Sequence, residues 1–242
     1  MVEQDDDMLV GRTMGQLVAL PDGTMLVLNG ATNGTAGFAN QTLYVPSLDQ
    51  MPFYQSLASG PVGTPSIYNP NAPKGSRWSS AGLGSTKIAR MYHSGAILLP
   101  DASVLIAGSN PNMDVELDAV YPTTYTAEIF YPPYFSSSVR PQVTGVPQTL
   151  NYGGPYFNLT VSSTSYAATS GNGAAANTTV VLSRGGFTTH AMHGPAARAA
   201  QQHVQCQRRR VVRAARLAGP AERERADAWA GAAVCRRERC AE

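Results

Sequence analysis

The sequence predicts an all-β protein, because it contains a hairpin motif, a second copy of that motif and many turn-forming residues. Glycine and proline account for 23 and 17 of the 242 residues, as a chain of many short strands and turns requires. Charged residues make up only 14% of the sequence, which suits a β protein better than a helical one. No apolar run is long enough to cross a bilayer, so we expect no membrane partner.

The clearest hairpin follows a tyrosine-histidine pair, Tyr92 and His93. An apolar run at residues 96–99 leads into a Pro-Asp turn, and a second run at 104–107 leads back out. Adjacent strand residues point to opposite faces, so the pair can reach one site only if the strand ends or kinks there. Phenolate oxygen and imidazole nitrogen together suit copper or iron. The alternative is structural, with a packed tyrosine and a histidine that satisfies one hydrogen bond.

The stretch at residues 14–27 repeats this hairpin design. Leu20-Pro21-Asp22 aligns with Leu99-Pro100-Asp101, which places Thr13-Met14 opposite Tyr92-His93. The first copy therefore has the hairpin without the pair that can bind a metal. It follows that the hairpin does not need tyrosine and histidine in order to fold.

A second pair of segments also repeats. Ser66-Ile67-Tyr68-Asn69-Pro70 matches Glu128-Ile129-Phe130-Tyr131-Pro132, and an Arg-Trp segment at 77–78 follows the first copy. The order of strand, hairpin, strand-proline and Arg-Trp indicates a Kelch-type propeller blade, which has four strands. We expect about two such blades in residues 1–139, with surface loops at 45–64 and 110–124.

Eight motifs stand in order between residues 8 and 192, and together they resemble fungal copper radical oxidases of the glyoxal oxidase type, which are relatives of galactose oxidase. The resemblance covers the carboxy-terminal half of that family. The motifs are Gly11-Arg12-Thr13-Met14-Gly15-Gln16, Pro52-Phe53, Ser59-Gly60-Pro61-Val62-Gly63-Thr64-Pro65, Arg90-Met91-Tyr92-His93-Ser94, Ala107-Gly108-Ser109-Asn110-Pro111-Asn112, Tyr121-Pro122-Thr123-Thr124-Tyr125, Glu128-Ile129-Phe130-Tyr131-Pro132-Pro133-Tyr134-Phe135 and Gly186-Phe187-Thr188-Thr189-His190-Ala191-Met192.

The resemblance implies a copper ion bound by an axial tyrosine, the histidine directly after it and a histidine in a downstream Thr-His pair. Carried over, the metal ligands are Tyr92, His93 and His190, and Tyr92 is also the catalytic general base. The implied reaction oxidises a small aldehyde or alcohol with O2 and releases H2O2. Without the resemblance, His190 reads as a solvated loop histidine.

The family also uses a tyrosyl radical on a tyrosine that is cross-linked to a cysteine. The three cysteines of this chain, Cys206, Cys235 and Cys240, match no such motif. We therefore expect the cross-linked pair to lie upstream of Met1, the chain to be a fragment that begins inside the fold, and the fragment to be inactive. The alternative function is a non-catalytic remnant with at most a binding role.

The second half is expected to begin at Arg140-Pro141. Strands are predicted at 156–161 and 178–183, with a small polar loop at 162–177 between them. The resemblance places an incomplete immunoglobulin-like sandwich of the E-set type at residues 140–192, with His190 on one of its turns. The fold as a whole is thus a partial propeller followed by an incomplete sandwich.

The chain changes character after Met192. Seven basic against 11 acidic residues give residues 1–192 a net charge of −4, whereas 11 arginines against five acidic residues give residues 193–242 a net charge of +6. A nucleic-acid-binding arm would interleave its arginines with aromatic residues, but only Trp229 is present. A zinc site from His203, Cys206, Cys235 and Cys240 would have unusual spacing. We expect neither partner.

A third interpretation is that residues 193–242 are translated out of frame. A shift of one nucleotide allows residues 193–196 to read Met-Gly-Gln-Arg, 201–210 to read Asn-Ser-Thr-Tyr-Ser-Val-Asn-Asp-Asp-Gly, and 233–242 to contain Leu-Phe-Val-Val-Val-Asn-Gly-Val-Pro. The last two are strand and turn sequences, and the first resembles the segment that the family has shortly after its metal histidine. We therefore expect this tail to lack a selected fold and to be disordered or spuriously helical, since alanine and arginine favour helix.

The expected location is extracellular, because the resembled family is secreted. Four Asn-X-Thr sequons agree with this, at Asn33, Asn40, Asn158 and Asn177. Residues 1–7 contain no basic segment followed by an apolar one, so we expect no signal peptide in this chain.

Overall fold

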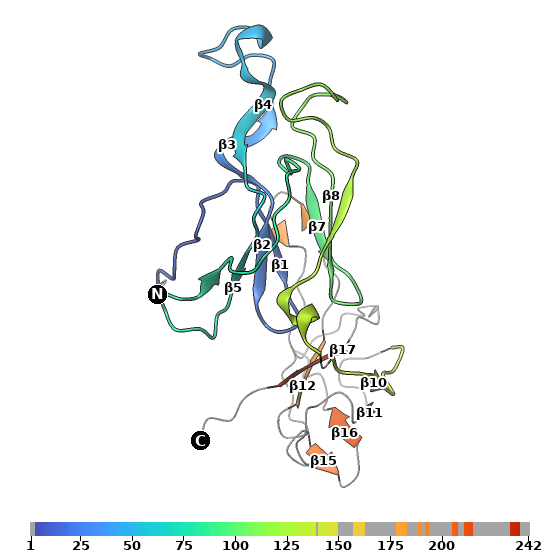
Figure 1. The fold of residues 1–242 in the computed structure, drawn as a ribbon. Coiled ribbons are helices and arrows are strands. Elements are labelled where there is room, and N and C mark those ends of the chain that lie inside the picture. The colour runs from blue at the N-terminus through green and yellow to red at the C-terminus, as the bar shows by residue number, and fades with distance from the viewer. Residues whose placement is uncertain are drawn as a thin grey trace, which may run out of the picture. The chain divides into compact units, whose positions relative to one another are not determined.

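The computed structural model describes residues 3–138, 140–149 and 157–162 together with six later strands. Two compact units make up the chain: Met1–Pro133 with Gly186–Pro195, and Tyr134–Gly185 with Ala196–Glu242. All regular structure in the described residues is β-strand apart from two 3-10 helices, η1 (Leu48–Gln50) and η2 (Pro133–Ser136). Neither helix is long and apolar enough to cross a membrane. The all-β prediction is confirmed (Figure 1).

A four-stranded antiparallel sheet forms the first part of the first unit. Its strands are β1 (Gln16–Ala19), β2 (Met25–Leu28), β5 (Ser66–Tyr68) and β6 (Trp78–Ser79), in that order. The β1–β2 turn is fixed locally, because Asp22 Oδ1 accepts hydrogen bonds from the Thr24 amide at 3.0 Å and hydroxyl at 2.7 Å. The first copy of the repeated segments thus forms one four-stranded sheet, and its assignment to a propeller blade stays a prediction.

A second sheet repeats the first three strands. It consists of β7 (Gly95–Leu98), β8 (Val104–Ala107) and β9 (Ala127–Phe130). Gly95 pairs with Ala107 as Gln16 pairs with Leu28, and every paired position lies 79 residues after its counterpart. Asp101 accepts from the Ser103 amide and hydroxyl, as Asp22 does from Thr24. The predicted hairpin repeat is therefore confirmed at the level of register and turn.

The expectation of a surface loop at residues 45–64 is wrong. Residues 52–61 form β4 (Pro52–Pro61), a ten-residue strand that pairs with β3 (Ala31–Phe38). Proline stands only at the two ends of β4, where a lost amide donor is tolerated. Figure 1 shows this hairpin reaching beyond the four-stranded sheet. The other loop, at 110–124, contains no strand.

The core of the first unit lies on the hairpin strands. Alternate residues are buried in β1, β7 and β8, whereas three consecutive residues, Leu26 to Leu28, are buried in β2. Val18, Leu26 and Val104 are completely buried. A second buried cluster joins Ala31, Ala58 and Met91 from different segments. This cluster anchors the base of the β3–β4 hairpin beside the residues that precede Tyr92.

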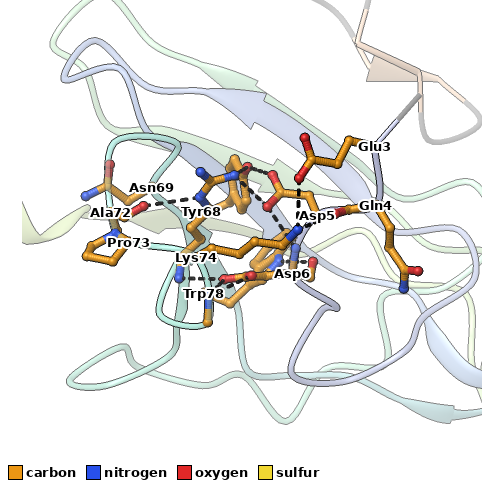
Figure 2. A network of polar contacts seen from close by, with 12 residues as sticks. Glu3, Gln4, Asp5, Asp6, Tyr68, Asn69, Ala72, Pro73, Lys74 and Trp78 are labelled. Carbon is orange, nitrogen blue, oxygen red and sulfur yellow. Dashed lines mark hydrogen bonds and ion pairs between the residues drawn. The ribbon is translucent and has the colours of Figure 1, made fainter. Parts of the chain in front are cut away.

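The amino-terminal segment is tied to the β5–β6 connection by the polar network in Figure 2. Asp6 accepts hydrogen bonds from the backbone amides of Gly75 at 2.7 Å and Arg77 at 3.0 Å. Asp5 accepts from the Tyr68 hydroxyl and forms an ion pair with Arg77 at 2.6 Å. The pKa of the Asp5 carboxyl is lowered, mainly by the hydrogen bond from Tyr68 and to a smaller extent by the hydrogen bond and positive charge of Arg77.

The second unit has two sheets in the residues that the structure describes. One has the order β10 (Val143–Thr144), β11 (Phe157–Val161), β16 (Val211–Ala214) and β15 (Gln205–Gln207), and the other pairs β12 (Thr178–Leu182) with β17 (Ala233–Arg237). The tail residues in these sheets are paired strands and not helix. Val211 and Val212 are β-branched, and β16 pairs with both β11 and β15. Both features favour strand over the helix that the composition predicted.

Candidate metal centre

Tyr92 and His93 lie in a turn and not within a strand. β7 begins only at Gly95, the Ser94 amide donates to the Met91 carbonyl at 3.1 Å, and His93 has a left-handed φ of 63°. The two rings stack, with centroids 3.9 Å apart and planes at 28°. The chain therefore turns at the Tyr-His pair, which is the condition under which two adjacent residues can reach one site. The turn brings both side chains to one side of the backbone.

The same backbone occurs in the first repeat. Met14, the counterpart of His93, has a φ of 59°. Ala31 donates its amide to Thr13 at 3.0 Å, just as Asn110 donates to Tyr92 at 2.7 Å. The left-handed turn is therefore a feature of the fold. The second repeat differs by carrying side chains that can bind a metal.

Arg90 fixes the chain directly before the pair. Its side chain is 1% exposed and forms an ion pair with Glu128 at 2.7 Å. The two terminal nitrogens donate to the carbonyls of Gly108 at 2.8 Å and Thr126 at 3.0 Å. Arg90 and Glu128 both occur in the sequence motifs, but sequence reasoning assigned them no role. The sequence does contain a signal for this ion pair, because an arginine and a glutamate both stand in motifs of the same predicted sheet, where a buried charge needs an opposite partner.

The donor set fits a copper ion. His93 is exposed and Tyr92 is half-buried, so the imidazole is open to an approaching ion while the backbone beneath it is fixed. No three histidine, cysteine or carboxylate side chains meet within the described residues. A copper ion at this turn would therefore use the Tyr92 phenolate and would need a further ligand from elsewhere in the chain.

His190, the third predicted ligand, lies outside the described residues. The strands on either side of it in the sequence are β13 (Thr188–Thr189) and β14 (Met192–His193), which pair with each other. Both strands lie against β1, and β13 also lies against β7. Residues 186–195 belong to the same compact unit as Tyr92 and His93. The flanking strands thus reach the sheet whose first strand follows the Tyr-His turn.

Comparison with known families decides the relationship. Residues 3–134, more than half of the chain, match the family model described as "Glyoxal oxidase N-terminus". The chain belongs to the glyoxal oxidase family. Residues 140–223 match the family model described as "Galactose oxidase-like, Early set domain". The predicted resemblance is confirmed, and the second match continues past Met192 into the arginine-rich tail.

Two plant aldehyde oxidases are similar to this chain. "Aldehyde oxidase GLOX" of Vitis pseudoreticulata is 38% identical over 151 residues, which are 61% of this chain and 25% of that protein. "Aldehyde oxidase GLOX1" of Arabidopsis thaliana is 33% identical over 196 residues, which are 79% of this chain and 28% of that protein. The chain therefore spans about a quarter of the length of these curated relatives.

A solved structure with a similar fold supports the all-β architecture. It is titled "Novel fungal alcohol oxidase with catalytic diversity among the AA5 family, in complex with copper". The TM-score is 0.63 and the sequence identity 16%, over 90% of this chain and 38% of that chain. At this identity the similarity concerns the fold.

Proposed function

We propose that this chain carries the tyrosine-histidine part of the copper site of an aldehyde or alcohol oxidase. The observation that carries the proposal is the stacking of Tyr92 on His93 in a left-handed turn that buried contacts hold in place. Membership of the glyoxal oxidase family and the names of the relatives support the same chemistry. The whole protein would oxidise a small aldehyde or alcohol with O2, yield H2O2 and act outside the cell.

Within this proposal each residue has a defined task. Copper, when bound, supplies one-electron redox chemistry. His93 and His190 would hold the ion through imidazole nitrogen, and Tyr92 through its phenolate oxygen. Tyr92 would also accept the proton that the substrate loses, because its phenolate oxygen would be one of the groups that hold the ion.

The residues of this chain do not complete a two-electron oxidation. Cysteine does not occur before Cys206, so residues 1–192 contain no partner for a cross-linked tyrosine. One metal that changes by one electron cannot remove two electrons from a substrate alone. We therefore expect this chain by itself to bind copper as an ordinary cupric centre and to show no catalytic oxidation of an aldehyde or alcohol. The alternative is a remnant that binds no copper.

Electron paramagnetic resonance of the chain loaded with one equivalent of copper tests the proposal. We expect nitrogen hyperfine coupling that His93→Gln reduces, because His190 would remain as a nitrogen ligand, and a signal that Tyr92→Phe alters. A spectrum unchanged by both substitutions would place the copper elsewhere, for example on the tail cysteines, and would overturn the site. Sustained H2O2 release with methylglyoxal or a simple alcohol would overturn the expectation of inactivity.

The tail bears on this function, and we propose that residues 193–242 are read out of frame. The support is positional. β17 (Ala233–Arg237) coincides with the five residues whose shifted reading is Leu-Phe-Val-Val-Val, and β15 ends at Gln207, where the shifted reading enters an Asn-Asp-Asp-Gly turn. The shifted sequence thus favours strand at β15 and β17, whereas at β16 the given residues Val211 and Val212 favour strand themselves.

A further inference from the structure

We propose that Gln16 and Asn29, two buried amides of the first hairpin, are positioning residues for His93. This inference rests on the proposed copper function, because it assigns support residues to that same site. Neither residue carries metal-binding chemistry itself. Both act through Ser94, the neighbour of His93.

The contacts form one buried network. The Gln16 side-chain amide donates to the Ser94 carbonyl at 3.2 Å and to the Met14 carbonyl at 2.9 Å. The Asn29 amide donates to Gln16 Oε1 at 2.5 Å and to Ser94 Oγ at 3.3 Å. Ser94 Oγ donates in turn to the Met91 carbonyl at 2.8 Å. The network therefore reaches both ends of the turn that contains Tyr92 and His93.

Burial makes this network rigid. Gln16 is 3% exposed, Asn29 4% and Ser94 9%. A buried amide that loses its partner is costly, so each member restricts the others to the observed arrangement. His93 is itself exposed and has a left-handed φ, which is uncommon for residues other than glycine. Its orientation therefore depends on the groups that hold the backbone behind it.

The internal repeat shows that the first hairpin supplies these amides to both turns, since Gln16 bonds Met14 of its own turn as well as Ser94 of the second. The counterparts of Gln16 and Asn29 in the second hairpin are Gly95 and Gly108, which have no side chain. A Cβ at Gly108 would stand 2.9 Å from the His93 carbonyl oxygen. The first hairpin, which lacks the Tyr-His pair, thus supplies the amides. In the second hairpin, Gly108 leaves space for the backbone of the turn at His93.

A copper-free measurement tests the positioning directly. Protons of the His93 imidazole lie against the Tyr92 ring, so ring current should move their resonances upfield in a histidine-selective NMR spectrum of the full chain. We expect Gln16→Met to remove this shift. Asn29→Gly is the second variant, because it deletes the amide and keeps the left-handed φ of 59° at that position.

Gln55→Met is the matched control. Gln55 is also a buried amide, 6% exposed, but it bonds Asn40 and Met113 and not the turn. We expect Gln55→Met to leave the His93 resonances in place. Unchanged His93 resonances in both folded Gln16 and Asn29 variants, or an equal change in Gln55→Met, would overturn the inference. If Gln16→Met does not fold, Asn29→Gly decides.

Copper titration then separates this inference from the proposed function. We expect the Gln16 and Asn29 variants to raise the Kd for Cu²⁺ by about tenfold or more, as loss of a support residue around a metal ligand commonly does. If the unaltered chain shows no His93-dependent copper binding but the ring-current shift still responds to Gln16→Met, the positioning stands and the proposed function fails. If copper binds through His93 and neither readout responds, the proposed function stands and the positioning fails.

Discussion

Arg12 and Arg90 make nearly the same contacts in the two repeats, yet among the residues that the structure describes only Arg90 has a charged partner. Arg12 donates to the carbonyls of Asn29 and Thr64, both at 3.2 Å, much as Arg90 donates to its two carbonyls. Ser66 stands in the first sheet where Glu128 stands in the second. Among the described residues, Arg12 Nε is buried with no hydrogen-bond partner. Burial lowers the pKa of Arg12.

This difference predicts the effect of Glu128→Gln. The change leaves the buried Arg90 guanidinium without a counter-charge, and we expect a loss of roughly 2 kcal/mol in the free energy of unfolding, below the usual range for a buried pair because Glu128 is 32% exposed. Urea unfolding of the whole chain measures it.

Lys74→Gln is the control for the Glu128 prediction. It breaks the exposed ion pair with Glu3, whose side chains are 56% and 84% exposed, and should cost less than about 0.5 kcal/mol. Equal losses in the two variants would show that burial of Arg90 does not matter.

At the scale of elements, local signals decide which strands the sequence reveals. The hairpins at 16–28 and 95–107 were predictable because a Pro-Asp turn between apolar runs is a local signal. The β3–β4 hairpin was not, because residues 31–38 are rich in glycine and threonine and residues 52–61 carry two prolines. Its pairing depends on contacts between distant residues, such as the Met113 amide with Gln55 at 2.6 Å.

Glycine at position 34 is required by that hairpin. Gly34 has a φ of 89°, and a Cβ there would stand 2.1 Å from the Leu57 carbonyl oxygen. Gly75 has the same φ but nothing within 4 Å of its Cβ position. We expect Gly75→Ala to cost about 1 kcal/mol from backbone strain alone, and Gly34→Ala to cost more because β4 must also move. Thermal unfolding of both variants compares them, and equal Tm losses would contradict the clash.

The amino-terminal segment gives a prediction for pH. Because the pKa of Asp5 is lowered from 3.8 in the folded chain, its contribution is present above pH 3.8 and is lost as the pH falls through the lowered value. Trp78 donates its indole NH to the Asp6 carbonyl at 3.0 Å, so Trp78 fluorescence should report release of the segment. We expect a change below pH 3.8 that Asp5→Asn removes. A transition that persists in Asp5→Asn would exclude Asp5 as its cause.

For the whole molecule, the sequence predicted the β class, the repeat and the Tyr-His pair, because each leaves a mark within a few residues. The supports of the pair were not predictable. Gln16 and Ser94 are 78 residues apart, and neither position carries a local signal that links it to the other. The domain boundaries at 139 and 192 stay predictions, as does the role of His190.

The proposal that residues 193–242 are read out of frame can be tested in the gene. We expect the transcript and genomic locus to differ, or to show an insertion or deletion of one nucleotide near codon 193 relative to close relatives. Restoring the frame should raise the Tm of the second unit, because β16 and β17 pair with β11 and β12 and would regain strand-forming residues. Close relatives that share this frame and lack the insertion or deletion would contradict the prediction, as would an unchanged Tm.

The shared left-handed turn at Met14 and His93 also has a meaning for how such centres arise. Duplication of the hairpin would have produced a second left-handed turn with the same backbone conformation, held in place by contacts with the first copy. Substitution of side chains at one turn could then introduce metal-binding residues, while the other turn kept its structural role. The capacity to bind a metal thus depends on side chains that can be exchanged without changing the turn that both repeats share.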